Sequence, residues 1–325
     1  MPSSSDGTVP PGQQPAAADY EYDLDAALAT VVGLRAMIPG DAFTAEVLGT
    51  ERAGSGVVIR RDGLVLTIGY LIAEAETIWL SLADGRVLPG HVLGYDQETG
   101  FGLVQALGRL DLPALKLGRS AAARIGQRVV VAGAGGRAGA LAARIVARQE
   151  FAGYWEYLLD EAIFTAPAHP NWGGAALIGP GGDLLGIGSL QLEQAGEGGA
   201  SEHLNMIVPI DLLPPILDDL LAIGRANRPA RPWLGLYATT VEDRVVVVGT
   251  ASGGPAQNAD LQRGDIVLAV DGAPVDELAG FFRRVWSRGE AGVAVPLTIY
   301  RDGRTLDLSI ASADRNRFFK AQSLH

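Results

Sequence analysis

Residues 54–67 read GSGVVIRRDGLVLT, and this stretch decides the fold of the longer part of the chain. Two apolar, β-branched runs, Val57–Ile59 and Leu64–Thr67, lie on either side of Arg61-Asp62-Gly63. Apolar runs joined by a short turn that contains Asp-Gly are typical of a β-hairpin. The stretch therefore predicts two antiparallel strands.

The same alternation of short strand and turn continues to residue 210. Further strands are predicted at Thr77–Leu82, Arg128–Ala132 and Leu184–Ile187. The chain carries 43 glycines and 18 prolines in 325 residues, which favours many turns over a few long helices. Turn signals spaced about 8–12 residues apart indicate an all-β barrel or sandwich.

Composition excludes several classes of function. The net charge is −11, so the chain lacks the basic balance that proteins need to grip phosphate backbones, and we expect no nucleic-acid partner. Cysteine is absent, which excludes disulfides, thiolate nucleophiles and cysteine-ligated metals. No cofactor is expected. No apolar run reaches the roughly 18 residues of a membrane span.

Composition shifts divide the chain into two domains. The predicted parts are a disordered tail over 1–19, a first domain over 20–224, a linker over 225–232, a second domain over 233–313 and a tail over 314–325. A helix is expected within 211–223, with Asp211 as its cap and Pro214 and Pro215 in its first turn. Gly224 would end that helix.

The second domain is predicted to combine short strands with one helix. The expected strands are Leu234–Ala238, Val245–Thr250, Ile266–Val270, Val295–Arg301 and Thr305–Ile310. The expected helix covers Asp276–Ser287.

Several segments together resemble one protein family. In addition to residues 54–67, these are LSLADGRVLPGHVLGYDQETGFGLV (80–104), LPALKLGRSAAARIGQRVVVA (112–132) and NWGGAALIGPGGDLLGIGSL (171–190). They resemble the trypsin-like domain of the HtrA/Deg serine proteases. RPWLGL (231–236) and ADLQRGDIVLAVDGAPV (259–275) resemble the PDZ domain that follows it. The resemblance implies a mainly β protein, a chymotrypsin/trypsin-like double β-barrel followed by a PDZ domain.

The residues that match the family's catalytic triad are not catalytic types. Tyr70 stands where the family has the His base, Gly100 where it has the Asp and Trp172 where it has the Ser nucleophile. A phenol with a pKa near 10 is a poor base at pH 7, glycine orients nothing, and an indole has no nucleophilic atom. We expect the bulky Trp172 to fill the place of a scissile bond.

The oxyanion loop is altered as well. Pro170, Asn171 and Gly173 surround Trp172 in this loop, and Pro170 has no backbone N–H to offer an oxyanion. None of the four histidines, at positions 91, 169, 203 and 325, falls at the base position. The resemblance thus implies a protease fold without its chemistry.

A PDZ domain binds an extended C-terminal peptide as an added strand and caps its carboxylate with backbone N–H groups. The resemblance places that loop at Trp233, Leu234, Gly235 and Leu236, with Tyr237 beginning the strand. From the helix, Phe281, Phe282 and Val285 are candidates either for the groove or for the domain core. The bulk of Trp233 raises the alternative of a groove that the chain itself occludes.

Three functional hypotheses stay open. The first is an inactive HtrA-like homologue, a pseudoprotease that binds peptides or protein C-termini through the PDZ domain and the vacated cleft. The second is an HtrA-type serine endopeptidase with non-standard catalytic residues. The third is a metal-binding or chaperone-like protein in which His169 and His203 hold a transition metal across the cleft. The alternative for these histidines is two solvent-facing side chains.

Partners and location follow from the resemblance and the N-terminus. Tyr20 and Tyr22 lie where HtrA relatives carry aromatic residues that build trimers, which implies a homotrimer. No signal peptide is visible, because the first residues lack a basic and an apolar region. The protein is expected in the cytoplasm if the chain is complete, and in the periplasm if a leader has been removed.

Overall fold

The computed structural model describes residues 8–195 and 201–320, and the chain divides into two compact units. The first unit contains the residues up to 149 together with 161–227. The second contains 150–160 together with 228–320. Both units consist mainly of β-strands, as the sequence predicts.

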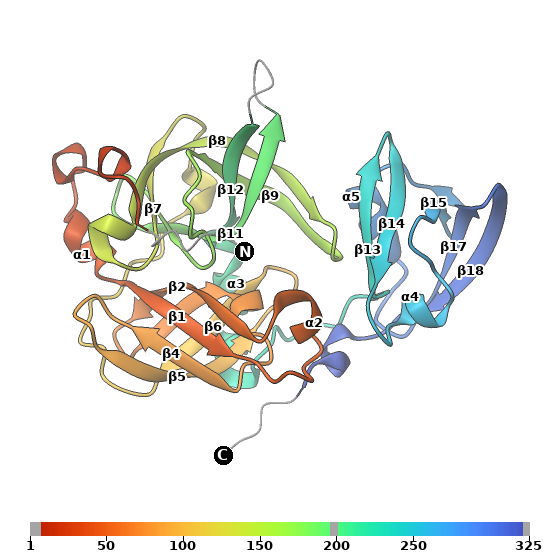
Figure 1. The fold of residues 1–325 in the computed structure, drawn as a ribbon, viewed down its shortest axis with the longest axis horizontal. Coiled ribbons are helices and arrows are strands. Elements are labelled where there is room, and N and C mark those ends of the chain that lie inside the picture. The colour runs from red at the N-terminus through yellow and green to blue at the C-terminus, as the bar shows by residue number, and fades with distance from the viewer. Residues whose placement is uncertain (1–7, 196–200, 321–325) are drawn as a thin grey trace. The chain divides into compact units, whose positions relative to one another are not determined.

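The first unit begins with a closed six-stranded barrel (Figure 1). Around the barrel its strands run in the order β1 (Val31–Met37), β2 (Glu51–Arg60), β3 (Leu64–Ile68), β6 (Phe101–Ala106), β5 (Val87–Tyr95) and β4 (Thr77–Ser81). The predicted hairpin is β2 and β3, which pair antiparallel, and Gly63 takes the positive φ of +88° that their turn requires.

A second closed barrel of six strands follows in the same unit (Figure 1). Its order is β10 (Ala176–Ile178), β11 (Leu184–Ala195), β12 (Ser201–Pro209), β9 (Tyr157–Ala166), β8 (Ala140–Gly153) and β7 (Arg128–Ala132). Val129, Val131, Ile163, Leu177 and Ile207 are fully buried in its core. The double barrel predicted from the sequence is confirmed.

Short helices connect and close the barrels. They are α1 (Leu24–Leu28), α2 (Ala45–Leu48) and α3 (Pro214–Ile223). Pro214 and Pro215 occupy the first turn of α3, and Gly224 ends it at a φ of +74°, both as predicted. Asp211 does not cap α3. Its carboxylate instead accepts from the backbone N–H groups of Ser120 and Ala121, which begin a short 3₁₀ turn far away in sequence.

The second unit contains one antiparallel sheet with two helices. The strands are β13 (Leu236–Val241), β14 (Arg244–Thr250), β15 (Ile266–Val270), β17 (Ala294–Arg301) and β18 (Arg304–Ala311) in that spatial order, and β16 (Ala273–Pro274) pairs with β15. The helices are α4 (Pro255–Asn258) and α5 (Leu278–Trp286). Strand β13 lies at the edge of this sheet, beside α5.

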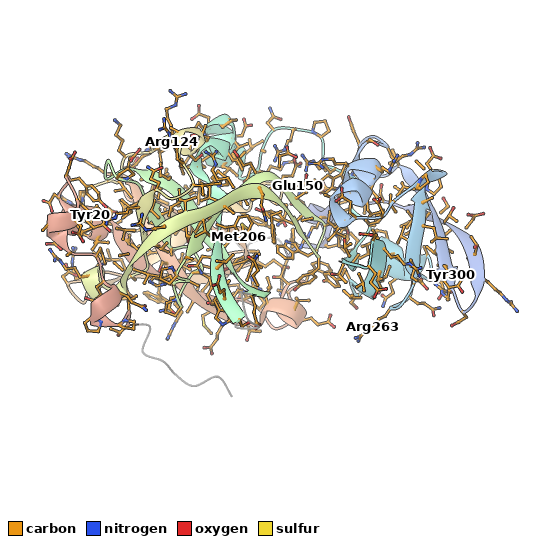
Figure 2. All side chains as sticks on the ribbon, turned by 90° about the horizontal axis from the view of Figure 1, so that it is seen from above. Tyr20, Arg124, Glu150, Met206, Arg263 and Tyr300 are labelled. Atoms are coloured by element: carbon orange, nitrogen blue, oxygen red, sulfur yellow. The ribbon has the colours of Figure 1, made fainter. Side chains whose placement is uncertain are left out.

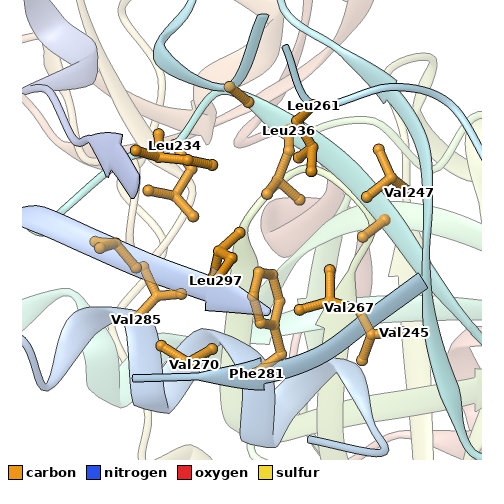
Figure 3. Packing of buried hydrophobic residues seen from close by; sticks show 14 of the residues in the cluster. Leu234, Leu236, Val245, Val247, Leu261, Val267, Val270, Phe281, Val285 and Leu297 are labelled. Atoms are coloured by element: carbon orange, nitrogen blue, oxygen red, sulfur yellow. The ribbon is translucent and has the colours of Figure 1, made fainter. Parts of the chain in front are cut away.

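The apolar face of α5 forms the centre of this unit's core. Phe281, Phe282 and Val285 are at most 1% exposed, and Phe281 points toward Val267 and Leu297 of the sheet (Figure 3). Of the two roles considered for these three residues, the structure therefore assigns the core.

Both predicted tails differ from the structure. Val9 is fully buried and its N–H donates to the Ala138 carbonyl, and Pro11–Gln13 and Ala17–Asp19 form 3₁₀ turns. At the other end, Arg315–Phe318 form a 3₁₀ turn, and the Phe318 ring lies 4.8 Å from that of Trp233. Composition alone misses such segments because a few buried contacts suffice to order them. Residues 1–7 and 321–325 lie outside the described part.

Replacing Phe281 by Ala tests the core of the second unit. The substitution leaves a cavity between α5 and the sheet, so we expect it to lower the free energy of unfolding of this unit by about 3–5 kcal/mol. Val248→Ala, at a residue that is 38% exposed, serves as the control and should change little. Denaturant unfolding measures both, and equal effects would contradict the assigned core.

Candidate functional site

The first candidate site lies where Tyr70 follows β3 in a 3₁₀ turn, Gly69–Leu71. The buried Arg52 holds this turn: its guanidinium donates to the carbonyls of Tyr70 (2.7 Å) and Ala73 (3.2 Å) and to the hydroxyl of Thr44 (2.8 Å). Because charge-assisted hydrogen bonds fix two points of the loop and tie it to Thr44, the position of Tyr70 is well defined.

The phenol of Tyr70 joins the two barrels. Its hydroxyl donates to the carbonyl of Ser189 in β11 at 2.9 Å, and it is also hydrogen-bonded to the side chain of Trp172. An indole can only donate, so the phenol oxygen accepts from Trp172. Burial raises the pKa of Tyr70 above the ordinary value of a phenol, which keeps it protonated at neutral pH.

Gly100 lies beside this pair through the backbone. Its carbonyl accepts from the N–H of Gly69 at 2.7 Å, and its φ of +85° ends the turn that follows Asp96. The structure thus brings together the Tyr70 loop, Gly100 and Trp172, the three positions predicted from the triad resemblance. Tyr70 and Trp172 form a hydrogen-bonded aromatic pair next to this glycine.

The loop that contains Trp172 directs several backbone donors inward. The N–H of Asn171 donates to the ring of His169 at 3.0 Å, that of Gly174 to the Gly188 carbonyl at 2.9 Å, and that of Ala175 to the Trp172 carbonyl at 3.0 Å. The carbonyl of Gly173 accepts from Ser55 at 2.8 Å. The N–H groups of Asn171, Gly174 and Ala175 are thus already bonded, and Pro170 has no N–H. These four residues therefore offer no hydrogen-bond donor to an oxyanion.

The two candidate metal ligands have different environments. His169 is fully buried, contrary to the solvent-facing alternative. Its Nδ1 accepts from Asn171, so Nε2 carries the proton and donates to the Gly139 carbonyl at 2.9 Å. Burial lowers the pKa of His169. His203 is exposed on β12, as expected. Within the described residues, no group of three or more possible ligands could hold a metal ion.

The second candidate site is the loop before β13. The backbone N–H groups of Leu234, Gly235 and Leu236 converge on one carboxylate, that of Glu156, at 3.0, 2.7 and 3.1 Å. Gly235 has a φ of +72°, a left-handed conformation that lets successive N–H groups point to one side. The predicted carboxylate-binding loop thus binds a carboxylate of its own chain.

The aromatic residues on either side of the loop Leu234–Leu236, Trp233 and Tyr237, have different surroundings. Trp233 is 7% exposed and is packed against Phe318, with the guanidinium of Arg315 6.0 Å from its ring. Its ring therefore packs within the unit, against Phe318 and beside Gly235 of the loop. Tyr237 is half-buried at the start of β13, and its ring lies 5.9 Å from that of Tyr154.

Comparisons with known proteins agree with this geometry. A family description of a trypsin-like peptidase domain matches residues 54–187, and one of a PDZ domain matches residues 232–311. The serine protease PepD of Mycobacterium tuberculosis is 27% identical over 289 residues, which cover 81% of this chain and 61% of PepD. The serine endoprotease DegS of Escherichia coli is 26% identical over 284 residues, which cover 79% and 75%.

The chain combines a trypsin-like peptidase domain with a PDZ domain and is similar to the HtrA/Deg serine proteases. A solved structure, the HtrA-type protease AlgW with a decapeptide, matches with a TM-score of 0.54 at 22% identity and covers 90% of this chain and 98% of that one. At this identity the match shows the fold. The chain spans about six tenths of the length of PepD.

Two further expectations concern the partners of this HtrA/Deg homologue. Among the described residues, no helix is both long and apolar enough to cross a membrane. The rings of Tyr20 and Tyr22 lie 5.4 Å apart, and that of Tyr22 packs directly on Gly182 of the same chain. Whether these rings also join copies of the chain in a trimer stays a prediction.

Sequence reasoning missed two participants. Ser189 enters through its backbone carbonyl, which no side-chain motif reveals. Glu156 lies at a hairpin tip 78 residues before Leu234 in sequence. A signal existed, because Glu156 is an acidic residue in the aromatic segment Phe151–Tyr157, but without the fold nothing connects that segment to the loop before β13.

Tyr70→Phe tests the aromatic pair. It removes the hydroxyl that bonds Ser189 and leaves the Trp172 indole N–H without its acceptor, so we expect the first unit to lose about 1–2 kcal/mol of unfolding free energy. Tyr300→Phe, at a residue 41% exposed, is the matched control. If both variants unfold at the same denaturant concentration, the bridge between barrels contributes nothing.

The pH dependence of stability tests the site of Glu156. Burial raises the pKa of Glu156 to about 7, while the three N–H groups and Arg315 act in the opposite direction. The folded state therefore keeps a proton that the unfolded chain releases near pH 4.5, so this stabilisation is lost as pH rises through 7. Relative to Glu156→Gln, the unmodified protein should lose on the order of 1–3 kcal/mol between pH 5 and 8. Parallel pH profiles of the two proteins would contradict this.

Proposed function

We propose that this protein is a catalytically inactive HtrA-like homologue, a pseudoprotease that serves as a peptide- or protein-binding scaffold. The observation that carries the proposal is the Tyr70–Trp172 pair, whose side chains bond to each other where a protease of this fold has its base and nucleophile. Acyl transfer needs an activated nucleophile, a base and an orienting group. A protonated phenol, an indole and a glycine supply none of them.

An endopeptidase with unusual residues is the weaker alternative. It needs a base beside a nucleophile, and histidine is the residue most often used. Both ring nitrogens of His169 are bonded to backbone groups, and His203 lies exposed on β12, where its Nδ1 is 3.4 Å from Gln191. The bonds that occupy His169 also argue against the metal-binding alternative.

The retained function is peptide binding by the PDZ domain. Strand β13 lies at the edge of its sheet, and the loop that precedes it presents three N–H groups to one carboxylate. An edge strand pairs with an extended peptide through main-chain hydrogen bonds, and converging N–H groups recognise a terminal carboxylate. The ligand class is therefore a peptide or protein with a free C-terminus.

A fluorophosphonate probe together with casein hydrolysis tests the catalytic part of the proposal. We expect no covalent labelling of the chain and no casein cleavage above buffer, with trypsin as the active control, because the residues at the expected triad positions supply neither a nucleophile nor a base. Trp172→Ala, which vacates the cleft without supplying a nucleophile, should behave identically. A labelled serine identified in this chain by mass spectrometry would overturn the proposal.

A further inference from the structure

The tip of the β8–β9 hairpin belongs to the PDZ unit by its contacts. Residues 150–160 form one compact unit with 228–320, although the rest of β8 and β9 belongs to the second barrel. Figure 2 labels Glu150 on this hairpin. Between the strands, Tyr154–Glu156 form the turn, and Glu156 has a φ of +60°. A left-handed residue other than glycine is uncommon, so its side chain merits an explanation.

That side chain ends in the carboxylate-binding loop. One carboxylate oxygen of Glu156 accepts from Gly235 and Leu236, and the other accepts from Leu234. The guanidinium of Arg315 also favours the charged form. A terminal carboxylate of a bound peptide would need the same three N–H groups.

The backbone before Glu156 continues along the strand edge. The N–H of Ala238 donates to the carbonyl of Tyr154 at 2.9 Å. Tyr154 lies two residues before Glu156, and Ala238 lies two residues after Leu236, so the spacing equals one strand repeat on both sides. The rings of Tyr154 and Tyr237 touch at 5.9 Å. The tip thus contacts the edge of β13 through one main-chain hydrogen bond and one pair of rings.

The stem of the hairpin contacts helix α5, which lies beside β13. Arg283 of α5 forms ion pairs with Glu150 and with Asp160, the latter at 2.6 Å, one from each strand of the hairpin. Ala152 packs against the apolar core of the unit. Strand edge, carboxylate loop and helix therefore all contact one segment.

We propose that residues 150–156 are an internal ligand of the PDZ groove, with the Glu156 side chain in the place of a peptide's C-terminal carboxylate. The internal ligand rests on the proposed peptide binding by the PDZ domain and describes how that binding would be regulated. An external peptide must displace the hairpin tip, which is covalently tethered and so acts at a high effective concentration. The displacing peptide offers a free carboxylate and, two residues before it, an aromatic side chain that packs on Tyr237 as Tyr154 does.

Hydrogen exchange without any peptide tests the internal ligand. In the full chain, the amides of Leu234, Gly235 and Leu236 should exchange at least tenfold faster in Glu156→Gln than in the unmodified protein, because an amide side chain has one acceptor oxygen where Glu156 uses two. Glu161→Gln, whose carboxylate pairs with Arg148 in the same hairpin, is the matched control and should leave these amides unchanged. Equal exchange in all three proteins overturns the proposal.

Peptide binding to the variants tests whether the hairpin tip competes with an external peptide for the same site. The probe is the heptapeptide EFAGYWV, which keeps residues 150–155 and ends in a free carboxylate, beside its C-terminally amidated form. We expect at least tenfold tighter binding to Glu156→Gln than to the unmodified protein or to Glu161→Gln, and loss of binding on amidation. A second variant, Glu150→Gln with Asp160→Asn, loosens only the stem and should give an intermediate affinity.

Failure of the internal ligand and failure of the proposed peptide binding would give different results. Equal affinity of the free-acid peptide for all variants overturns the internal ligand, even though peptide binding itself stands. Faster amide exchange in Glu156→Gln without binding of either peptide supports the internal ligand and contradicts the proposed peptide-binding function.

Discussion

The carboxylate of Glu156, held by three converging N–H groups, is the interaction on which the organisation of the PDZ unit depends. Backbone N–H groups that are turned inward need an acceptor, and leaving one unsatisfied costs more than a made bond returns. The left-handed Gly235 aims three such donors at one point. An acceptor there is therefore needed in every state of the domain, and the hairpin tip supplies one from within the chain.

The protease-like cleft meets the same requirement in a different way. Tyr70 accepts from Trp172 and donates to Ser189, so each polar group of the pair has a partner. The N–H groups of Asn171, Gly174 and Ala175 likewise bond within their own region. A site that performs chemistry keeps donors in reserve for a transition state. Here the N–H groups of Asn171, Gly174 and Ala175 are committed to bonds of the resting fold.

The fold could be predicted from the sequence because it follows from local patterns. Alternating apolar runs and Asp-Gly turns determine strands such as β2 and β3, and Pro214 and Gly224 bound α3 correctly. The assignment of Tyr70, Gly100 and Trp172 to the triad positions stays a prediction from the resemblance, since the structure shows where these residues lie and not which role a relative gives them. What could not be predicted were partners chosen by tertiary contact: Asp211 caps a distant turn, His169 is buried, and Glu156 reaches the loop before β13.

The Tyr70–Trp172 pair and the hairpin tip at the loop before β13 differ in how firmly they are held. Trp172 bonds to Tyr70, and the Tyr70 loop is held by two hydrogen bonds from the buried Arg52. The hairpin tip is held instead by hydrogen bonds at a sheet edge and by half-exposed ion pairs of Arg283, and exposed ion pairs contribute little. A carboxyl with a pKa of about 7 adds a dependence on pH to that contact. The proposed exchange of the hairpin tip for a peptide therefore places regulation at the loop before β13, where the contacts are weaker than those around Trp172.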